Sequence, residues 1–231
     1  MKRIGIIGGI GPASTLDYYA GIIEGYRSKT GGNDYPEIII NSVNMTEMLS
    51  YVQNKDWKSL ENMLIDAIND LANAGAELAA IASNTPHIVF DSVEKRSPIP
   101  LISIVEETCR YAQEKGCKRA FVIGLLFTME SGLYSNALGK YAIEAIVPSD
   151  EEKRMIHELI FPNLENGIVV QEDKQKMLAI VGRLITEQNA DALVLGCTEL
   201  PLMIKEEDLD IMILNAAEIH IKAIVNSIAG P

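Results

Sequence analysis

The chain has 231 residues, of which 48% are hydrophobic and 23% are charged, and its 20 basic and 32 acidic side chains give a formal net charge of −12. That length is enough to bury a sizeable core, as one large domain or as two small lobes. Nucleic acids and anionic membranes attract clustered Lys and Arg, so the charge argues against both as partners and favours a small-molecule ligand.

The chain has three cysteines, Cys109, Cys117 and Cys197. An odd number of cysteines without a secretion signal does not describe a disulfide framework, so a cytoplasmic protein is expected. The apolar start at Ile4–Ile7 is too short, and too soon broken by glycine, for a signal peptide or a membrane span. It is predicted to be a strand.

Short apolar runs alternate with segments of helical period along the first half of the chain. The predicted elements are, in order, a strand from Ile4 to Gly8, a helix from an N-cap at Ser14 to about Lys29, a strand from Glu37 to Ile40, an amphipathic helix from Trp57 to Ala74, and a buried strand from Leu78 to Ala82. Gly31-Gly32 and Gly75 are predicted to end the two helices. This alternation predicts an α/β fold with parallel sheets.

The second half repeats the first in outline. Strands are predicted from Ala120 to Gly124 and from Ala192 to Leu195, and Cys197 follows Gly124 at nearly the same separation as Ser83 follows Gly8. The halves therefore look like a duplication. We predict two pseudo-symmetric Rossmann-like lobes with mainly parallel sheets and an active site in the cleft between them, because ligands gather at the carboxyl ends of such strands. The first lobe would comprise residues 1–99 and 212–231, and the second residues 100–211.

Cys197 is the strongest single candidate for chemistry. It follows a buried strand and precedes a short helix, where backbone N–H groups and the helix dipole lower the pKa of a thiol. A thiolate there can act as a base. The alternative is a buried, inert cysteine. That interpretation is favoured for Cys109, on the face of a predicted helix from Glu107 to Gly116, and for Cys117 at the end of this helix, since neither has a polar cluster around it.

Ser83 occupies the matching place in the first half. A hydroxyl is a poor base near neutral pH without a partner, and His87, four residues on, is the nearest candidate for a proton relay. A histidine that only begins the next helix is the alternative for His87. The segment Ser83-Asn84-Thr85 is either a turn and capping cluster or a set of donors for a carboxylate.

The glycine-rich segment from Gly8 to Pro12 does not fit a dinucleotide site. Its spacing is not G-x-G-x-x-G, and the following strand runs into Asn41-Ser42 without an acidic residue for a ribose. The same loop, at Ile10 and with the hydroxyls of Ser14 and Thr15, offers donors to the carboxylate of an amino acid. No metal site is predicted, because the three histidines share no short ligand spacing.

The chain resembles the aspartate/glutamate racemase family of cofactor-independent racemases. The resemblance spans nearly the whole chain and is carried by Ile4–Gly9, by Ser83–His87, by Leu195–Leu200 and by Ala217–His220. It implies two Rossmann-like lobes with a small amino acid bound between them, no pyridoxal phosphate or other cofactor, and a homodimer. In that family one cysteine on each face of the α-carbon exchanges a proton, one as thiolate base and the other as thiol acid.

The resemblance also assigns roles to neighbouring residues. Asn84, Thr85 and Thr198 would bind the α-carboxylate, with Thr128 assisting, and Glu199 would pair with the α-ammonium. These neutral donors suit the developing enediolate, which a dry site with preformed donors must stabilise.

This sequence departs from the family pattern in two places. Ser83 stands where the first catalytic cysteine is found, and the segments that carry an Arg and a Lys in aspartate-specific members hold none, at residues 41–54 and 164–166. Without a cation, an acidic substrate side chain would be left unpaired. Gln53 is a candidate for binding a neutral polar side chain instead.

The leading hypothesis is an amino-acid racemase for aspartate, glutamate or a broader set, with Cys197 as main acid/base and Ser83 as its weaker counterpart. Two alternatives remain open: a single-thiol decarboxylase or isomerase of the same superfamily, and a catalytically silent amino-acid-binding protein.

Overall fold

The computed structural model describes residues 2–32 and 34–230 of the chain. Internal contacts divide these residues into two compact units. The first unit comprises the residues up to Ile104 together with those from Ala217 onward, and the second unit comprises Val105–Ala216.

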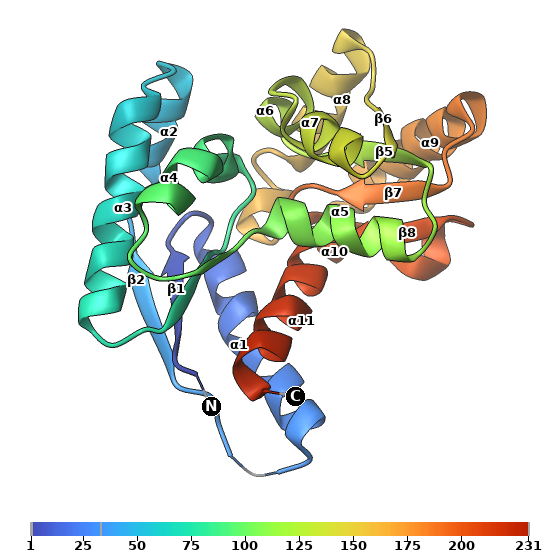
Figure 1. The fold of residues 1–231 in the computed structure, drawn as a ribbon. Helices are drawn as coiled ribbons and strands as arrows, with labels where there is room; N and C mark the ends of the chain where they lie inside the picture. The colour runs from blue at the N-terminus through green and yellow to red at the C-terminus, as the bar shows by residue number, and fades with distance from the viewer. Residues whose placement is uncertain (1, 33, 231) are drawn as a thin grey trace. The chain divides into compact units, whose positions relative to one another are not determined.

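The first unit is built on a four-stranded parallel sheet. Its strands are β1 (Ile4–Gly8), β2 (Ile38–Ser42), β3 (Leu78–Ile81) and β4 (Leu101–Ile102), in the spatial order β2-β1-β3-β4. The helical elements of this unit are α1 (Pro12–Thr30), α2 (Met45–Gln53), α3 (Trp57–Asn73), the 3-10 turn η1 (Thr85–Val89), α4 (Phe90–Arg96) and α11 (Ala216–Ala229). In Figure 1, α1 and α11 lie side by side, and α2, α3 and α4 gather on the opposite side of the strands.

The second unit has its own four-stranded parallel sheet. Its strands are β5 (Arg119–Ile123), β6 (Glu144–Ile146), β7 (Ala192–Leu195) and β8 (Met212–Asn215), in the order β6-β5-β7-β8. Its helical elements are α5 (Ile104–Glu114), α6 (Leu126–Glu130), α7 (Leu133–Lys140), α8 (Asp150–Ile160), η2 (Leu164–Asn166), α9 (Gln171–Gln188), α10 (Leu200–Met203) and η3 (Glu206–Asp208). The two sheets thus have the same strand order, with β3 equivalent to β7, and the predicted α/β class with parallel sheets is confirmed.

Small residues let α1 approach α11 closely in the first unit. A Cβ at Gly21 would lie 3.0 Å from Ile221, and a Cβ at Gly25 would lie 3.0 Å from Val225. The apolar faces of both helices then cover alternate residues of the strands. This core contains Ile4, Ile6, Tyr18, Ile22, Tyr26, Leu78, Ala80, Ala82, Ile224, Val225 and Ile228.

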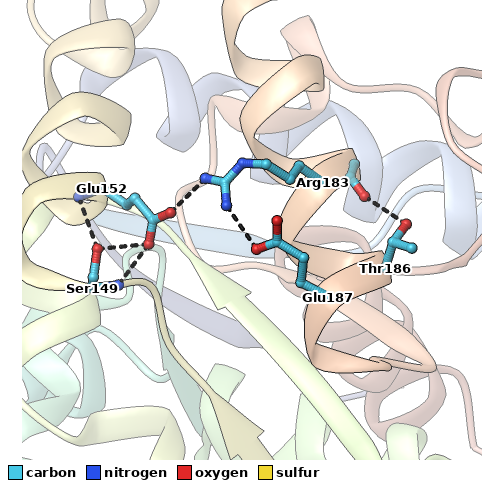
Figure 2. A network of polar contacts seen from close by, with 6 residues as sticks. Ser149, Glu152, Arg183, Thr186 and Glu187 are labelled. Carbon is cyan, nitrogen blue, oxygen red and sulfur yellow. Dashed lines mark hydrogen bonds and ion pairs between the residues drawn. The ribbon is translucent and has the colours of Figure 1, made fainter.

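In the second unit, α8 and α9 cover the face of the sheet that carries Phe121, Ile123, Leu193 and Leu195. A polar network joins the two helices at their surface (Figure 2). Ser149 caps α8 by a reciprocal pair of hydrogen bonds with Glu152, and Glu152 also accepts a 2.5 Å hydrogen bond from Arg183 of α9. These contacts lower the pKa of Glu152 to about 2, so this carboxylate is ionised throughout the physiological range.

The structure differs from the sequence-based expectations at several boundaries. β4 is hydrogen-bonded to β3 in the first sheet, and β8 to β7 in the second, whereas the expected limits at 99/100 and 211/212 assigned each edge strand to the other lobe. Helix α1 begins at Pro12, with Gly11 rather than Ser14 at the N-cap position. Its end at Thr30, with Gly31 in the left-handed conformation, agrees with the prediction.

Candidate active site

Ser83 and Cys197 occupy equivalent places in the two units. β3 pairs with β1 up to Ile7–Ile81, and β7 pairs with β5 up to Ile123–Leu195. Ser83 and Cys197 each follow the end of their strand by two residues. Each side chain therefore lies at the carboxyl edge of its parallel sheet, where α/β proteins bind their ligands.

Cys197 is buried and lies against a carboxylate. Its Sγ donates a hydrogen bond to Glu199 Oε2 at 3.1 Å, and Thr198 Oγ1 donates to the same oxygen at 2.8 Å. Cys197 and Glu199 each expose only 6% of their surface. In this arrangement the thiol keeps its proton, and the Glu199 carboxylate accepts the hydrogen bond.

The expected lowering of the Cys197 pKa is wrong. Burial raises this pKa well above its usual value of 9.0, and the charges of Glu199 and Glu165 raise it further. The hydrogen bond from the backbone N–H of Glu199 lowers the pKa of the thiol, but this effect is smaller than the increase caused by burial and by the charge of Glu199. The helix that follows, α10, has only four residues, so it offers a weak dipole to offset the two carboxylates.

Glu165 is a member of this cluster that the sequence analysis did not single out. It lies in η2, is half-buried, and its pKa is raised by burial and by the charge of Glu199. Among the described residues, the charges that shift the pKa of Cys197 and of Glu165 are those of carboxylates, Glu199 and Glu165 for the thiol and Glu199 for Glu165. The surroundings of the thiol therefore favour a positively charged ligand group. The sequence indicates Glu165 only indirectly, because it lies in residues 164–166, where the resemblance implies a Lys in aspartate-specific members.

Two glycines bring Thr128 next to the Cys197 loop. A Cβ at Gly196 would lie 2.9 Å from Ile123 O and 3.0 Å from Thr128 Cγ2, and a Cβ at Gly124 would lie 3.1 Å from Gly196 O. Thr128 belongs to α6 and is 3% exposed. Only glycine at both positions allows α6 and the β7 end to approach this closely. Thr128 thus lies beside the residue that precedes Cys197.

The turn after β3 presents Ser83 next to two buried polar residues. Ser83 is half-buried, and its hydroxyl makes no hydrogen bond with any residue that the structure describes, His87 included. Asn84 and Thr85 are 4% and 9% exposed. The backbone N–H of His87 donates to Asn84 O at 3.0 Å, which closes the turn into η1. A direct proton relay from Ser83 to His87 is absent from this arrangement of the described residues.

The glycine-rich loop is held by the hydroxyls that were expected to bind a ligand. Thr15 Oγ1 accepts from Gly9 N at 2.9 Å and donates to Gly11 O at 3.2 Å, and Ser14 Oγ donates to Ala82 O at 2.9 Å. Ser14 therefore links the loop to the residue that precedes Ser83. These contacts give Ser14 and Thr15 structural roles in the loop.

Two further candidates from the sequence differ in their surroundings. Ile10 is 4% exposed, and because its side chain is a hydrocarbon, only its backbone N–H can act as a donor. Gln53 is the last residue of α2 and is exposed. The structure does not bring Gln53 into hydrogen-bonding contact with any other candidate residue among those it describes.

The other two cysteines, Cys109 and Cys117, are buried in the second unit. Burial raises the pKa of Cys109 to about 12. Burial and the hydrogen bond from Cys117 Sγ to Asp191 Oδ1, at 2.9 Å, raise the pKa of Cys117 to about 12. Both thiols stay protonated near neutral pH, which agrees with the inert role expected for them.

The structure describes residues 2–32 and 34–230. Within these ranges, no three His, Cys, Asp or Glu side chains are grouped so as to hold a metal ion. No helix in the same part of the chain combines the length and apolarity required to cross a bilayer.

Comparison with known proteins identifies the class of this fold and site. Residues 7–224 match the family model described as Asp/Glu/Hydantoin racemase. The chain therefore belongs to the Asp/Glu/hydantoin racemase family. The match covers the second sheet, the first sheet from the end of β1 onward, and both segments that carry Ser83 and Cys197.

Individual relatives extend over the full chain. The chain is 25% identical over 230 residues to the broad specificity amino-acid racemase RacX of Bacillus subtilis strain 168, and the alignment covers 97% of each protein. The crystal structure of an aspartate racemase homologue from Pyrococcus horikoshii OT3 has 36% sequence identity, covers 100% of both chains, and superposes with a TM-score of 0.89. The aspartate racemase of Picrophilus torridus shares the fold, at 24% identity, with 98% of this chain and 94% of that chain covered and a TM-score of 0.75.

Proposed function

We propose that this protein is a cofactor-independent amino-acid racemase that acts on aspartate, glutamate or a broader set of amino acids. Cys197 is the main acid/base, and Ser83 is the weaker group that exchanges a proton on the other face of the α-carbon. The observation that carries this proposal is the 3.1 Å hydrogen bond from Cys197 Sγ to Glu199 Oε2, in a chain of the racemase family.

The contact between Cys197 and Glu199 suggests how the base is formed. In the free protein the carboxylates of Glu199 and Glu165 hold the pKa of the thiol high. An α-ammonium group that pairs with Glu199 neutralises the nearer negative charge and removes the hydrogen-bond acceptor of the thiol. Both effects lower the pKa of Cys197, so the bound substrate itself promotes the thiolate that removes its α-proton.

The reaction then needs donors for the negative charge that develops on the α-carboxylate. Removal of the α-proton converts this group to an enediolate, and a proton returned to the opposite face completes the inversion. Buried neutral donors stabilise such a charge without having to reorganise. Asn84 and Thr85 beside Ser83, and Thr128 beside Cys197, are the buried residues that we assign to this role. Thr198 donates its hydroxyl proton to Glu199 Oε2, so it can join them only when the α-ammonium takes its place at Glu199.

The same surroundings argue against strict specificity for acidic amino acids. Among the described residues, the charges that shift the pKa of Cys197 and of Glu165 are those of carboxylates, and Glu165 itself is negatively charged when ionised. A substrate carboxylate near Glu165 would be repelled and unpaired. We therefore favour a broad range of substrates, for which the broad-specificity racemase among the relatives is a precedent.

The proposal is tested by hydrogen exchange at the α-carbon. The protein is incubated in heavy water with each enantiomer of aspartate, glutamate and a panel of neutral and basic amino acids. Proton loss is followed by NMR and inversion by optical rotation. Exchange accompanied by inversion supports the racemase. The absence of exchange across the panel contradicts it and leaves the single-thiol lyase and the silent binding protein as alternatives.

The protonated state of Cys197 favours one further candidate, a lyase that uses a single thiol. A decarboxylase leaves an enediolate when carbon dioxide departs from a 1,1-dicarboxylate, and the thiol then only has to donate a proton. A thiol with a raised pKa suits that step without any second acid/base. Release of carbon dioxide from substituted malonates, without α-proton exchange in amino acids, would favour the lyase over the racemase.

A further inference from the structure

His87 is a buried ring enclosed by other aromatic side chains of the first unit. It is 4% exposed, its ring stacks on Phe90 with centroids 5.0 Å apart, and it meets His220 edge to face at 6.5 Å. This packing fixes the orientation of the imidazole. Each ring nitrogen therefore faces a defined part of the backbone.

The hydrogen bond at Nε2 determines the state of the ring. His87 Nε2 lies 3.3 Å from Ile104 N, and a backbone amide can only donate. Nε2 is therefore the unprotonated nitrogen, and the neutral ring carries its hydrogen on Nδ1. Burial and the neighbouring His220 support this assignment, since they lower the pKa of His87 to about 3.

The backbone amide of Ile104, which donates the hydrogen bond to His87, lies at the start of a helix. Ile104 is the first residue of α5 and the last residue of the first unit before the chain enters the second. The first amides of a helix lack partners within that helix. His87 provides a partner for one of them, and so joins the segment after Ser83 to the start of α5.

The opposite nitrogen faces the turn that carries Ser83. His87 Nδ1 is buried and makes no hydrogen bond with the residues that the structure describes. The backbone carbonyl groups of Ser83 and Asn84 lie near enough to favour the protonated ring. A buried donor without a partner is unfavourable, so a small movement of the turn onto Nδ1–H is stabilising.

We propose that neutral His87 is a positioning residue for Ser83. Its Nε2 anchors the Ser83–Thr85 turn to the start of α5, and its Nδ1–H binds the carbonyl groups of that turn when the turn closes on a ligand. His87 fixes where the Ser83 hydroxyl is presented and does not carry the proton itself. This inference rests on the proposed function for the role of Ser83, whereas the anchoring of Ile104 can be measured without any activity.

Two substitutions separate positioning from proton relay. His87→Gln keeps an acceptor that can reach Ile104 N but cannot titrate near neutral pH, and His87→Phe keeps an aromatic ring that can stack on Phe90 without any hydrogen bond. Positioning predicts that His87→Phe lowers kcat for inversion about 10- to 100-fold with little change in KM. His87→Gln should stay within a few-fold of the original protein, with an unchanged pH profile.

The exchange of backbone amides provides the readout that does not depend on activity. Peptides covering the start of α5 should exchange faster in His87→Phe than in His87→Gln. Ile228→Val, which removes one methylene from the hydrophobic core of the first unit, controls for a general loss of stability and should alter neither kcat nor the protection of Ile104.

Three outcomes overturn the inference. These are equal protection of Ile104 in both His87 variants, a loss of kcat in His87→Gln as large as in His87→Phe, and recovery of His87→Phe by added imidazole. The last two would indicate a proton relay. If the original protein exchanges no amino acid proton, the proposed function fails, and the amide protection alone then decides whether His87 anchors α5.

Discussion

Cys197 and Glu199 form a thiol–carboxylate pair in which Sγ donates to Oε2 at 3.1 Å. The carboxylate raises the pKa of the thiol, and burial adds to that effect. In the proposed mechanism, Cys197 acts as a base only after a cation has neutralised Glu199. The predictions below follow from this relationship and from the surroundings of the two histidines of the first unit.

Replacing Glu199 by Gln should increase the reactivity of Cys197 while impairing the reaction. The amide removes the negative charge next to Sγ, so alkylation of Cys197 at pH 8 is expected to become about 3- to 10-fold faster. The α-ammonium loses its charged partner, so KM should rise about 10- to 100-fold. Mass spectrometry of alkylated peptides measures the first effect and initial rates the second. Slower alkylation would contradict the assigned role of the carboxylate.

Glu165→Gln should act in the same direction with a smaller effect. Glu165 is half-buried and is the weaker of the two charges that raise the pKa of Cys197. Alkylation of Cys197 is expected to speed up about 2- to 3-fold. Amino acids with acidic side chains should gain in kcat/KM relative to neutral ones. An equal gain for all substrates would show that Glu165 does not face the substrate side chain, and Glu158→Gln on α8 serves as a surface control.

The Ser83→Cys variant tests whether the hydroxyl limits inversion. A thiol is a far better acid and base near neutral pH than a hydroxyl. The ratio of inversion to α-proton exchange should therefore rise, about 10-fold or more, while exchange of the enantiomer served by Cys197 changes little. Parallel NMR and optical measurements give this ratio. An unchanged ratio would indicate that the second proton does not pass through residue 83.

Folding stability should fall as the pH is lowered, because His87 and His220 are buried in their neutral form. Burial lowers their pKa values to about 3 and about 4 from 6.5. A depressed folded-state pKa contributes stability above the unfolded value, and this stability is lost as the pH falls from 6.5 toward 4. Each ring accounts for about 1.4 kcal/mol per pH unit in that window. Urea unfolding at pH 7.5, 6 and 5 measures the slope, which should be smaller in His220→Gln.

The elements that position the site could largely be predicted from the sequence. β1, β7 and the end of α1 have strong local signals, namely buried apolar runs and a glycine that adopts positive φ after the helix. The short edge strands β4 and β8 were assigned to the wrong lobes because their membership depends on pairing with β3 and β7. Such pairing joins residues far apart in the chain and leaves no local pattern.

The chemistry of the site was predicted less completely than its location. Cys197 and Ser83 could be located by their offsets from buried strands, but the direction of the thiol pKa could not. That direction depends on burial and on Glu165, which lies far from Cys197 in sequence. Ser14 appeared to be a ligand donor because its partner, Ala82 O, is likewise distant in sequence.

The central claim is that Cys197 exchanges the α-proton of an amino acid. The most direct measurement compares deuterium incorporation at the α-carbon in heavy water for the original protein, Cys197→Ala and the matched control Cys109→Ala, with both enantiomers of each substrate. We predict that exchange disappears in Cys197→Ala and persists in Cys109→Ala. Exchange that continues in Cys197→Ala at the rate of the original protein would contradict the account.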